Sequence, residues 1–368
     1  MLAELERHPH AQAILGPVLA GGQPSHAYLF HGPGGADKGA VARELAARWL
    51  CEGSSDPASA RARALSGAHP DLTWVVPSGA HEILVSDIAE PVVAAASKTP
   101  FESSRRVFVI ERVDELGDEA ANRMLKTLEE PAWFVHLILL TDRVSDVLPT
   151  ISSRCQLVRF DAPEEQAVAV EIQAPGLEPQ EALACARLSL GDLDQARELA
   201  GEAGSELRVQ AERLARAALA GQAAAGKPWA ELLAAVRARG DAVREELEQR
   251  AQEELGLVPR KERKRLETEW NERIRRARRR VETRTLDLAL QLVALWYADL
   301  AALGWDAPEL VRHVHRLEVL QSGPRSDSAR LLSAIEAVEE TRRSFELNVS
   351  EELACEALTY RLERLLAA

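Results

Sequence analysis

The sequence predicts an α/β domain followed by an all-α region. Short apolar runs bounded by turn residues alternate with helical patterns over the first 160 of the 368 residues, and after Phe160 the strand signal disappears. Aromatic residues make up only 4% of the chain and methionines number two, so the core must consist mainly of Leu, Ala and Val, which favours helices. At about 150 residues a domain, this length predicts two or three domains.

The first 160 residues predict a mostly parallel sheet covered by helices. The expected strands are five short runs, at residues 26–30, 72–76, 107–110, 135–140 and 156–160. The first run stops at a glycine-rich loop, and a helical pattern follows over residues 41–50 with apolar residues three and four apart. Apolar runs separated by helices are typical of parallel strands that are buried on both faces.

The region after Phe160 is expected to be helical. Residues 161–165 combine an Asp at an N-cap position, a Pro in the first turn and two acids, all of which favour a helix start. Short helices are expected to about Gly204. The helices beyond are expected to break near residues 226, 256 and 323, where a glycine is followed within three residues by a proline.

Composition and charge exclude several classes of protein. The net charge is −13, which argues against a protein whose whole surface clamps nucleic acid. Four cysteines without a C-x-x-C spacing exclude a disulfide scaffold and a zinc ribbon. No apolar run approaches the ~20 residues that span a bilayer, and the acidic N-terminus lacks the basic start of a signal peptide. We expect a soluble cytoplasmic protein without membrane association.

One segment, residues 260–284, is basic in this acidic chain, and it belongs to a charged helical stretch near residues 240–284. It carries twelve Lys or Arg and five Glu, a net charge of +7. One interpretation is a solvated helix held by i,i+4 pairs such as Glu269–Arg273 and Glu272–Arg276. The other is contact with nucleic-acid phosphates through its arginines. The sequence leaves both open, although the overall charge opposes an independent DNA-binding protein.

A loop at residues 32–39 follows a strand and opens a helix, the context that a phosphate-binding loop requires. A working loop has the pattern G-x-x-x-x-G-K-[ST]. Gly32 and Lys38 stand in place, but Asp37 replaces the second glycine and Gly39 replaces the hydroxyl residue. A carboxylate about 4 Å from a phosphate charge is repelled by roughly 4 kcal/mol at an effective dielectric of about 20, and the lost hydroxyl removes a magnesium ligand. We therefore expect Lys38 to be a surface lysine on a relic loop.

The second half of such an ATPase site is also altered. An ATPase needs a strand that ends in two acids, one for the metal and one for water. The run at 107–110 ends in Glu111-Arg112, and an arginine stays protonated and cannot act as a general base. The expected relic site consists of Gly32, Gly34, Gly35, Lys38 and Glu111.

Three motifs together resemble those of bacterial DNA polymerase III clamp-loader subunits, which are AAA+ proteins. They are HAYLF before the loop, NRMLKTLEEP at residues 122–131 and ISSRC at residues 151–155. The resemblance covers roughly the first 200 residues well and continues loosely into the C-terminal helices. It implies an AAA+ P-loop-type domain over 1–160, a small helical lid over 161–204 and a helical oligomerisation collar over 205–368. In the collar, Leu286, Leu290, Val293 and Tyr297 form an apolar stripe able to pack against other helices.

This family contains an ATP-hydrolysing gamma/tau motor and a related subunit that needs no nucleotide of its own. The motor has an intact loop, an Asp-Glu pair and a sensor arginine in the lid, where this chain has Asp194. In these departures from the motor's pattern, the chain resembles the second kind of subunit. The resemblance implies that the chain has no enzyme activity by itself. It also implies that the chain is a subunit of the DNA polymerase III holoenzyme, a DNA-directed DNA polymerase complex. The implied partners are gamma/tau and delta subunits, the sliding clamp and primed DNA. The alternative is an active gamma/tau-like ATPase with an atypical loop.

Arg154 is the residue to which the resemblance gives a catalytic role. It implies an arginine finger acting in trans on the γ-phosphate of ATP held by an adjacent subunit; the other interpretation is a surface arginine that pairs with an acid. Cys155 is then expected to be a packing residue, because no His is marked to activate it. The family usually carries four cysteines ahead of the His-Pro-Asp at 69–71, whereas only Cys51 stands there. Neither zinc nor a nucleotide of its own is therefore expected.

Overall fold

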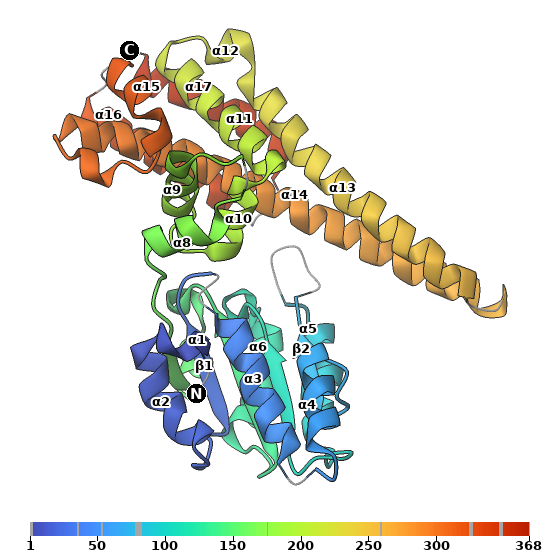
Figure 1. The fold of residues 1–368 in the computed structure, drawn as a ribbon. Coiled ribbons are helices and arrows are strands. Elements are labelled where there is room, and N and C mark those ends of the chain that lie inside the picture. Colours follow the sequence, from blue (N-terminus) through green and yellow to red (C-terminus); the bar gives the residue numbers. More distant parts are fainter. Residues whose placement is uncertain are drawn as a thin grey trace. The chain divides into compact units, whose positions relative to one another are not determined.

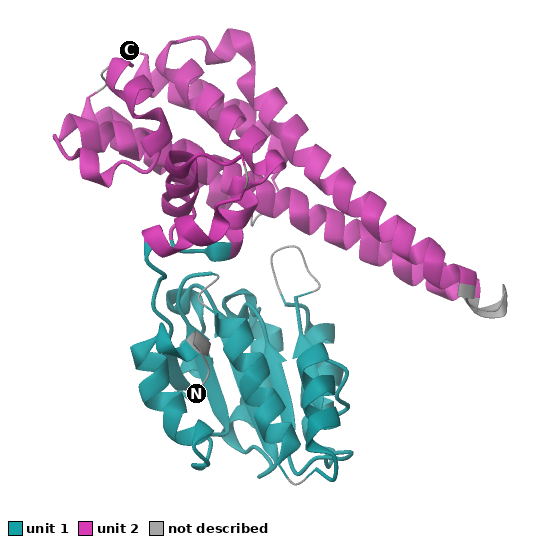
Figure 2. Cartoon of the chain, viewed as in Figure 1, with its two compact units in different colours: residues 1–164, 191–193 teal, residues 165–190, 194–368 magenta. Residues whose placement is uncertain are grey.

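The computed structural model describes residues 3–34, 37–52, 54–77, 83–174, 176–257, 260–323, 327–345 and 349–367. Packing divides the chain into two compact units (Figure 2). Unit 1 comprises residues 1–164 with 191–193, and unit 2 comprises residues 165–190 with 194–368. Unit 1 is α/β and unit 2 is helical, which confirms the predicted fold class.

Unit 1 is built around a five-stranded parallel sheet with the strand order β2-β3-β4-β1-β5 (Figure 1). The strands are β1 (Ala27–His31), β2 (Leu72–Val75), β3 (Arg106–Ile110), β4 (Val135–Thr141) and β5 (Gln156–Arg159). All five lie within one residue of the predicted bounds at each end. His31 at the end of β1 is opposite Thr141 at the end of β4, so the segments that follow these two strands meet at one edge of the sheet.

Helices cover both faces of this sheet. One face packs against α1 (Ala3–Glu6), α2 (Pro9–Leu19), α3 (Lys38–Cys51) and α4 (Pro57–Ser66). The other packs against α5 (Val85–Ile88), the π-helical turn η1 (Ala89–Ala94), the 3-10 turn η2 (Val113–Glu115), α6 (Asp118–Glu129) and α7 (Pro149–Ser152). The 3-10 turn η3 (Val144–Asp146) follows β4. Alternate strand residues enter opposite cores, as a strand period of two requires: Phe30 and Val109 lie on one side, Leu29 and Phe108 on the other.

Unit 2 consists of helices and short turns. They are α8 (Glu165–Ile172), α9 (Pro179–Leu188), α10 (Leu193–Ala200), α11 (Glu202–Leu219), α12 (Ala223–Gly226), α13 (Pro228–Leu257), α14 (Arg260–Gly304), η4 (Pro308–Leu310), η5 (Val314–Arg316), α15 (Leu317–Ser322), α16 (Ser328–Ser344) and α17 (Glu351–Leu366). The three predicted breaks each coincide with the end of a helix. The predicted division into domain, lid and collar stays a prediction, and the lid helices α8 and α9 pack within unit 2.

The antiparallel helices α13 and α14 lie side by side over much of α13, and the later part of α14 packs against α11 and α16 (Figure 1). One window of α14 is long and apolar enough to cross a membrane by composition, but 67% of it is buried within the protein, as in a core helix. The predicted stripe lies in the same helix. Its four residues are at most 1% exposed, so they pack against the chain's own helices rather than offering a surface for assembly.

The basic segment, residues 260–284, lies in α14 and is partly neutralised by the chain's own acids. The predicted pair Glu272–Arg276 is confirmed at 2.8 Å. Arg278 reaches across to Asp241 of α13 at 3.2 Å. These contacts fit a solvated helical hairpin, and contact with nucleic acid stays a prediction.

The predicted pair Glu269–Arg273 is wrong. Glu269 instead binds Arg265, one turn earlier in α14, at 2.8 Å. The Arg273 guanidinium lies 4.7 Å from the centre of the Trp270 ring, a cation–π contact that competes with an exposed ion pair of small net energy.

A polar cluster inside unit 2 joins α9 to α11 and to the turn before α15. The Arg208 side chain is 6% exposed and binds Glu181 at 2.5 Å, and its guanidinium lies 3.4 Å from Nε2 of His315. Burial, with the Arg208 cation beside the ring, lowers the pKa of His315 to about 4. The His315 ring is therefore neutral near pH 7.

Unit 2 is expected to lose stability between pH 6.5 and pH 4. The pKa of a histidine is about 6.5 in the unfolded chain and about 4 for His315 in the folded chain. Over this window the unfolded state binds more protons, so the free energy of unfolding falls as the pH falls. Urea unfolding at several pH values, compared between the wild type and His315→Gln, measures this contribution. A pH slope that the substitution leaves unchanged would contradict it.

Candidate functional site

The segments after β1, β3 and β4 meet at the carboxyl edge of the sheet in unit 1. Gly32 opens the loop after β1 with φ at 147°, and a Cβ there would lie 2.3 Å from the carbonyl oxygen of Phe160. Only glycine fits this position. Gly34 belongs to the same loop, whereas Gly35 lies outside the described residues.

Lys38 is buried and bound to its own loop, so the expectation of a surface lysine is wrong. Its side chain is 7% exposed, and Nζ forms an ion pair with Asp142 at 2.8 Å. Nζ also donates hydrogen bonds to the carbonyl oxygens of Gly32, at 2.6 Å, and of Pro33. An ammonium has three donors, and these three contacts use all of them. Parallel pairing of β1 with β4 places Asp142, one residue beyond β4, beside this lysine.

Asp37 places a fixed negative charge at the N-terminus of α3. It has the left-handed φ of 57°, a conformation that the missing glycine would adopt without strain. Its carboxylate binds Arg7 at 2.9 Å and lies 3.5 Å from Nε2 of His8. His8 is oriented by the backbone N–H of Asp161, which donates to Nδ1 at 3.1 Å. The carboxylate thus adds a negative charge near a helix N-terminus, a place that would otherwise favour a phosphate, although it makes no hydrogen bond to the N–H groups of α3.

A third carboxylate lies against the loop. A Cβ on Gly34 would be 1.8 Å from Oδ2 of Asp192, so the Asp192 side chain is in close contact with Gly34. Together Asp37, Asp142 and Asp192 border the loop. A polyanionic triphosphate brought here would meet three carboxylates and a lysine whose donors are already used.

The two residues that follow β3, Glu111 and Arg112, also form contacts within the protein. Glu111 accepts a hydrogen bond from the indole Nε1 of Trp74 at 2.6 Å, and Arg112 pairs with Glu115. Thr141, at the end of β4, donates to Asp114 at 2.7 Å. Across the described ranges no three His, Cys, Asp or Glu side chains gather closely enough to hold a metal ion. The described residues at this edge of the sheet are thus engaged in contacts within the protein.

Arg154 lies between α7 and β5, in the second site that the sequence indicated. Its side chain is 34% exposed and forms an ion pair with Glu129. Its Nη1 donates to the carbonyl oxygen of Thr150 at 2.9 Å and to Oγ of Ser153 at 3.3 Å. In the chain without partners, Arg154 therefore pairs with an acid, Glu129. Its role as an arginine finger in trans requires a neighbouring subunit and stays a prediction.

Two other predicted positions serve local structure. Burial raises the pKa of Cys155 to about 12, which keeps the thiol protonated and fits a packing residue. Asp194, in the place of the family's sensor arginine, is 81% exposed and binds Arg197 at 3.0 Å.

Asp71 is a buried residue whose importance the sequence did not reveal. Its carboxylate is fully buried and accepts the backbone N–H groups of three consecutive residues, at distances of 2.5, 2.9 and 2.9 Å, those of Phe101, Glu102 and Ser103. One side chain thus binds three consecutive backbone groups of the loop before β3. Phe101, which this loop carries, is 84% exposed.

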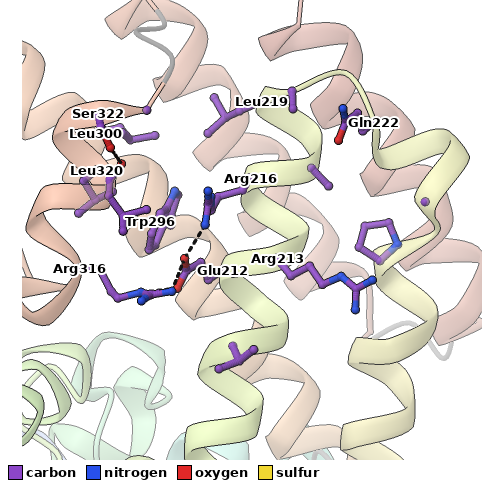
Figure 3. Close-up of a pocket in the computed structure, with 17 residues that line it drawn as sticks. Glu212, Arg213, Arg216, Leu219, Gln222, Trp296, Leu300, Arg316, Leu320 and Ser322 are labelled. Carbon is purple, nitrogen blue, oxygen red and sulfur yellow. Dashed lines mark hydrogen bonds and ion pairs between the residues drawn. The ribbon is translucent and has the colours of Figure 1, made fainter.

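A cavity of about 650 Å³ lies in unit 2, away from the predicted sites (Figure 3). Its wall includes Trp296 and an ion-pair network in which Glu212 of α11 binds both Arg316, at 2.8 Å, and Arg216, at 3.1 Å. The pair with Arg316 joins α11 to η5, whereas the pair with Arg216 lies within α11. The charged wall thus includes one link between two segments of unit 2.

Comparison with known proteins adds to this geometry. Residues 7–164 match the model of the family described as DNA polymerase III, delta subunit. The chain is similar to the DNA polymerase III subunit delta' of Pseudomonas aeruginosa, 33% identical over 211 residues that cover 55% of this chain and 64% of that one. The subunit delta' of Bacillus subtilis is 35% identical over 167 residues, 44% of this chain and 50% of that one. The chain thus spans between half and two thirds of these curated relatives. A solved DNA polymerase III gamma subunit-related protein of Thermotoga maritima aligns over 96% of this chain and 99% of its own, with a TM-score of 0.44 and 16% identity.

Proposed function

We propose that this chain acts as a delta prime-like subunit of the clamp loader, because residues 7–164 match the model of the DNA polymerase III delta-subunit family. In this role it helps to load the sliding clamp onto primed DNA without hydrolysing ATP itself. Gamma/tau and delta subunits are its partners, ATP is bound by the partners, and the complex works in the cytoplasm. The observation that carries the proposal is that Lys38 is bound by groups of its own chain, namely Asp142 and two carbonyl oxygens of the loop.

Two features of this region support a non-hydrolysing role. To bind a phosphate, the Lys38 ammonium would have to break its contacts with two carbonyl oxygens and with Asp142. These acceptors would then lose their buried donor, which costs free energy. In addition, Gly39 supplies no hydroxyl group to hold Mg²⁺, and Arg112 supplies no base for water. The same contacts oppose the alternative of an active gamma/tau-like ATPase, which measurable ATP turnover by the isolated chain would support.

The isolated chain is expected to bind Mg²⁺-ATP with a Kd weaker than about 1 mM, a binding free energy of less than roughly 4 kcal/mol. Equilibrium dialysis with labelled ATP measures this directly. The variant Asp37→Gly with Gly39→Ser restores the loop pattern and removes one carboxylate, so it should bind ATP more tightly than the wild type. Tight, Mg²⁺-dependent binding by the wild type would refute the proposal.

Arg154 gives such a subunit a way to act on a neighbour. A guanidinium is planar, always charged and carries five donors in a geometry that matches phosphate oxygens. Arg154 is partly exposed on unit 1, in the same chain whose own loop is filled. We assign it the role of an arginine finger on the ATP of an adjacent subunit. Residues 205–368 are assigned the role of the oligomerisation collar, by the resemblance of these helices to the family.

A further inference from the structure

Arg154 is held by three acceptors, and these use only part of its hydrogen-bonding capacity. Nη1 donates to the carbonyl oxygen of Thr150 and to Oγ of Ser153, and Nη2 donates to Glu129. A guanidinium has five N–H donors. Among the described residues, these contacts account for three and leave the N–H of Nε and one N–H of Nη2. Nε and Nη2 lie on one edge of the guanidinium, an edge whose two donors can bind a phosphate.

Glu129 is badly placed for the stability of its own helix. It is the last residue of α6, where the helix dipole is negative and a carboxylate is unfavourable. Its position is nonetheless well fixed, because Leu128 before it and Met124 one turn earlier are at most 1% exposed in the core of unit 1. A rigid helix end thus presents a carboxylate to Arg154, which lies 25 residues further along the chain.

We propose that Glu129 is a positioning residue for Arg154. The carboxylate holds one N–H of Nη2 and so fixes the plane of the guanidinium, with the edge formed by Nε and Nη2 left for a phosphate of the neighbouring subunit. An unrestrained arginine would have to be ordered in each catalytic cycle, whereas this one is ordered before the phosphate arrives. The inference rests on the proposed role of Arg154 in trans.

The variant Glu129→Gln tests this inference, because the amide keeps the size of the side chain and removes its charge. It is assayed in the complex with gamma/tau and delta subunits, with clamp and primed DNA. ATP hydrolysis is expected to fall about tenfold in kcat, with KM for ATP unchanged, since a misplaced finger is felt in the transition state. Glu130→Gln, at the next and also exposed position, is the matched control and should keep wild-type rates.

Arg154→Ala and the double variant complete the experiment. If Glu129 acts through Arg154, then Glu129→Gln has no further effect in the Arg154→Ala background. Gel filtration and the thermal midpoint should stay unchanged for each single variant, which excludes a merely structural role.

The possible outcomes separate this inference from the proposed function. Unchanged hydrolysis in the Arg154→Ala complex defeats the proposed function itself. If Arg154→Ala is slow but Glu129→Gln has the wild-type rate, the positioning role is overturned and the arginine finger stands. A rate above wild type for Glu129→Gln, or a further loss in the double variant, also overturns it, because Glu129 would then restrain Arg154 or act independently of it.

Discussion

Arg154→Ala is expected to leave the chain folded and the complex assembled, while ATP hydrolysis by the partner subunits falls. An arginine finger contributes roughly 10³- to 10⁵-fold to the rate at a single site in other phosphoryl-transfer systems, because it stabilises charge that develops in the transition state. A complex with several ATP sites loses only the share that this residue governs. Steady-state ATPase with clamp and primed DNA measures the total loss, and clamp loading on the same samples measures its consequence.

The chain should tolerate this substitution because Arg154 is partly exposed and its ion pair with Glu129 is at the surface. Such pairs contribute up to about 1 kcal/mol. Arg154→Lys should restore little of the rate, since an ammonium cannot reproduce the two-donor fork. Arg159→Ala is a matched control, because Arg159 is exposed and also pairs with an acid, Asp161, at 2.7 Å. Unchanged hydrolysis by an intact Arg154→Ala complex would make Arg154 an ordinary surface residue.

The strands of unit 1 were predictable because each is a short apolar run that ends at a turn. The seven residues of β4 are all buried, so every position must be apolar or internally paired, and the run is visible without any knowledge of its neighbours. The order of the strands is less visible. It depends on which runs pair with which, and residues far apart in the chain decide that.

The loop around Lys38 shows where prediction from the sequence ends. Asp37 and Gly39 break a pattern of adjacent residues, so the damage is visible in the sequence. The carboxylates of Asp142 and Asp192 come from distant segments, and only the parallel register of β1 with β4 brings the first of them to Lys38. A lysine without visible partners was therefore predicted at the surface, whereas the fold buries it.

The charged helix α14 shows a second limit. Charges spaced four apart predict a pair, but Glu269 has basic residues both four before and four after it, Arg265 and Arg273. Which arginine pairs with Glu269 depends on Trp270, because the Arg273 guanidinium lies over the Trp270 ring. Spacing alone does not include such a competitor.

Asp71→Asn is expected to destabilise unit 1 by about 3 kcal/mol. Oδ2 accepts two backbone N–H groups and Oδ1 accepts a third, that of Phe101. An asparagine can keep two of these bonds through its amide oxygen, but its NH₂ group then faces an N–H, and two donors confront each other in the protein interior. The bonds that remain also lose their charge assistance, which is worth about 1.5–3 kcal/mol for hydrogen bonds to charged groups. The measurement is hydrogen exchange of the full-length chain, read on peptides from β2 and β3.

Asp56→Ala is the control for this prediction. The Asp56 carboxylate, like that of Asp71, accepts a backbone N–H, but it accepts only one, that of Ser59 at 3.1 Å, and it lies at an exposed helix start. Its loss should cost about 1 kcal/mol, since water replaces the missing acceptor. Asp71 differs because its surroundings admit no such replacement, and its backbone carbonyl oxygen also accepts the N–H of Val107 beside the sheet. Protection in β2 and β3 should therefore fall far more for Asp71→Asn than for Asp56→Ala, with unit 2 unaffected in both. Equal losses would mean that the loop before β3 is held by its other contacts, and that the buried carboxylate contributes no more than an exposed one.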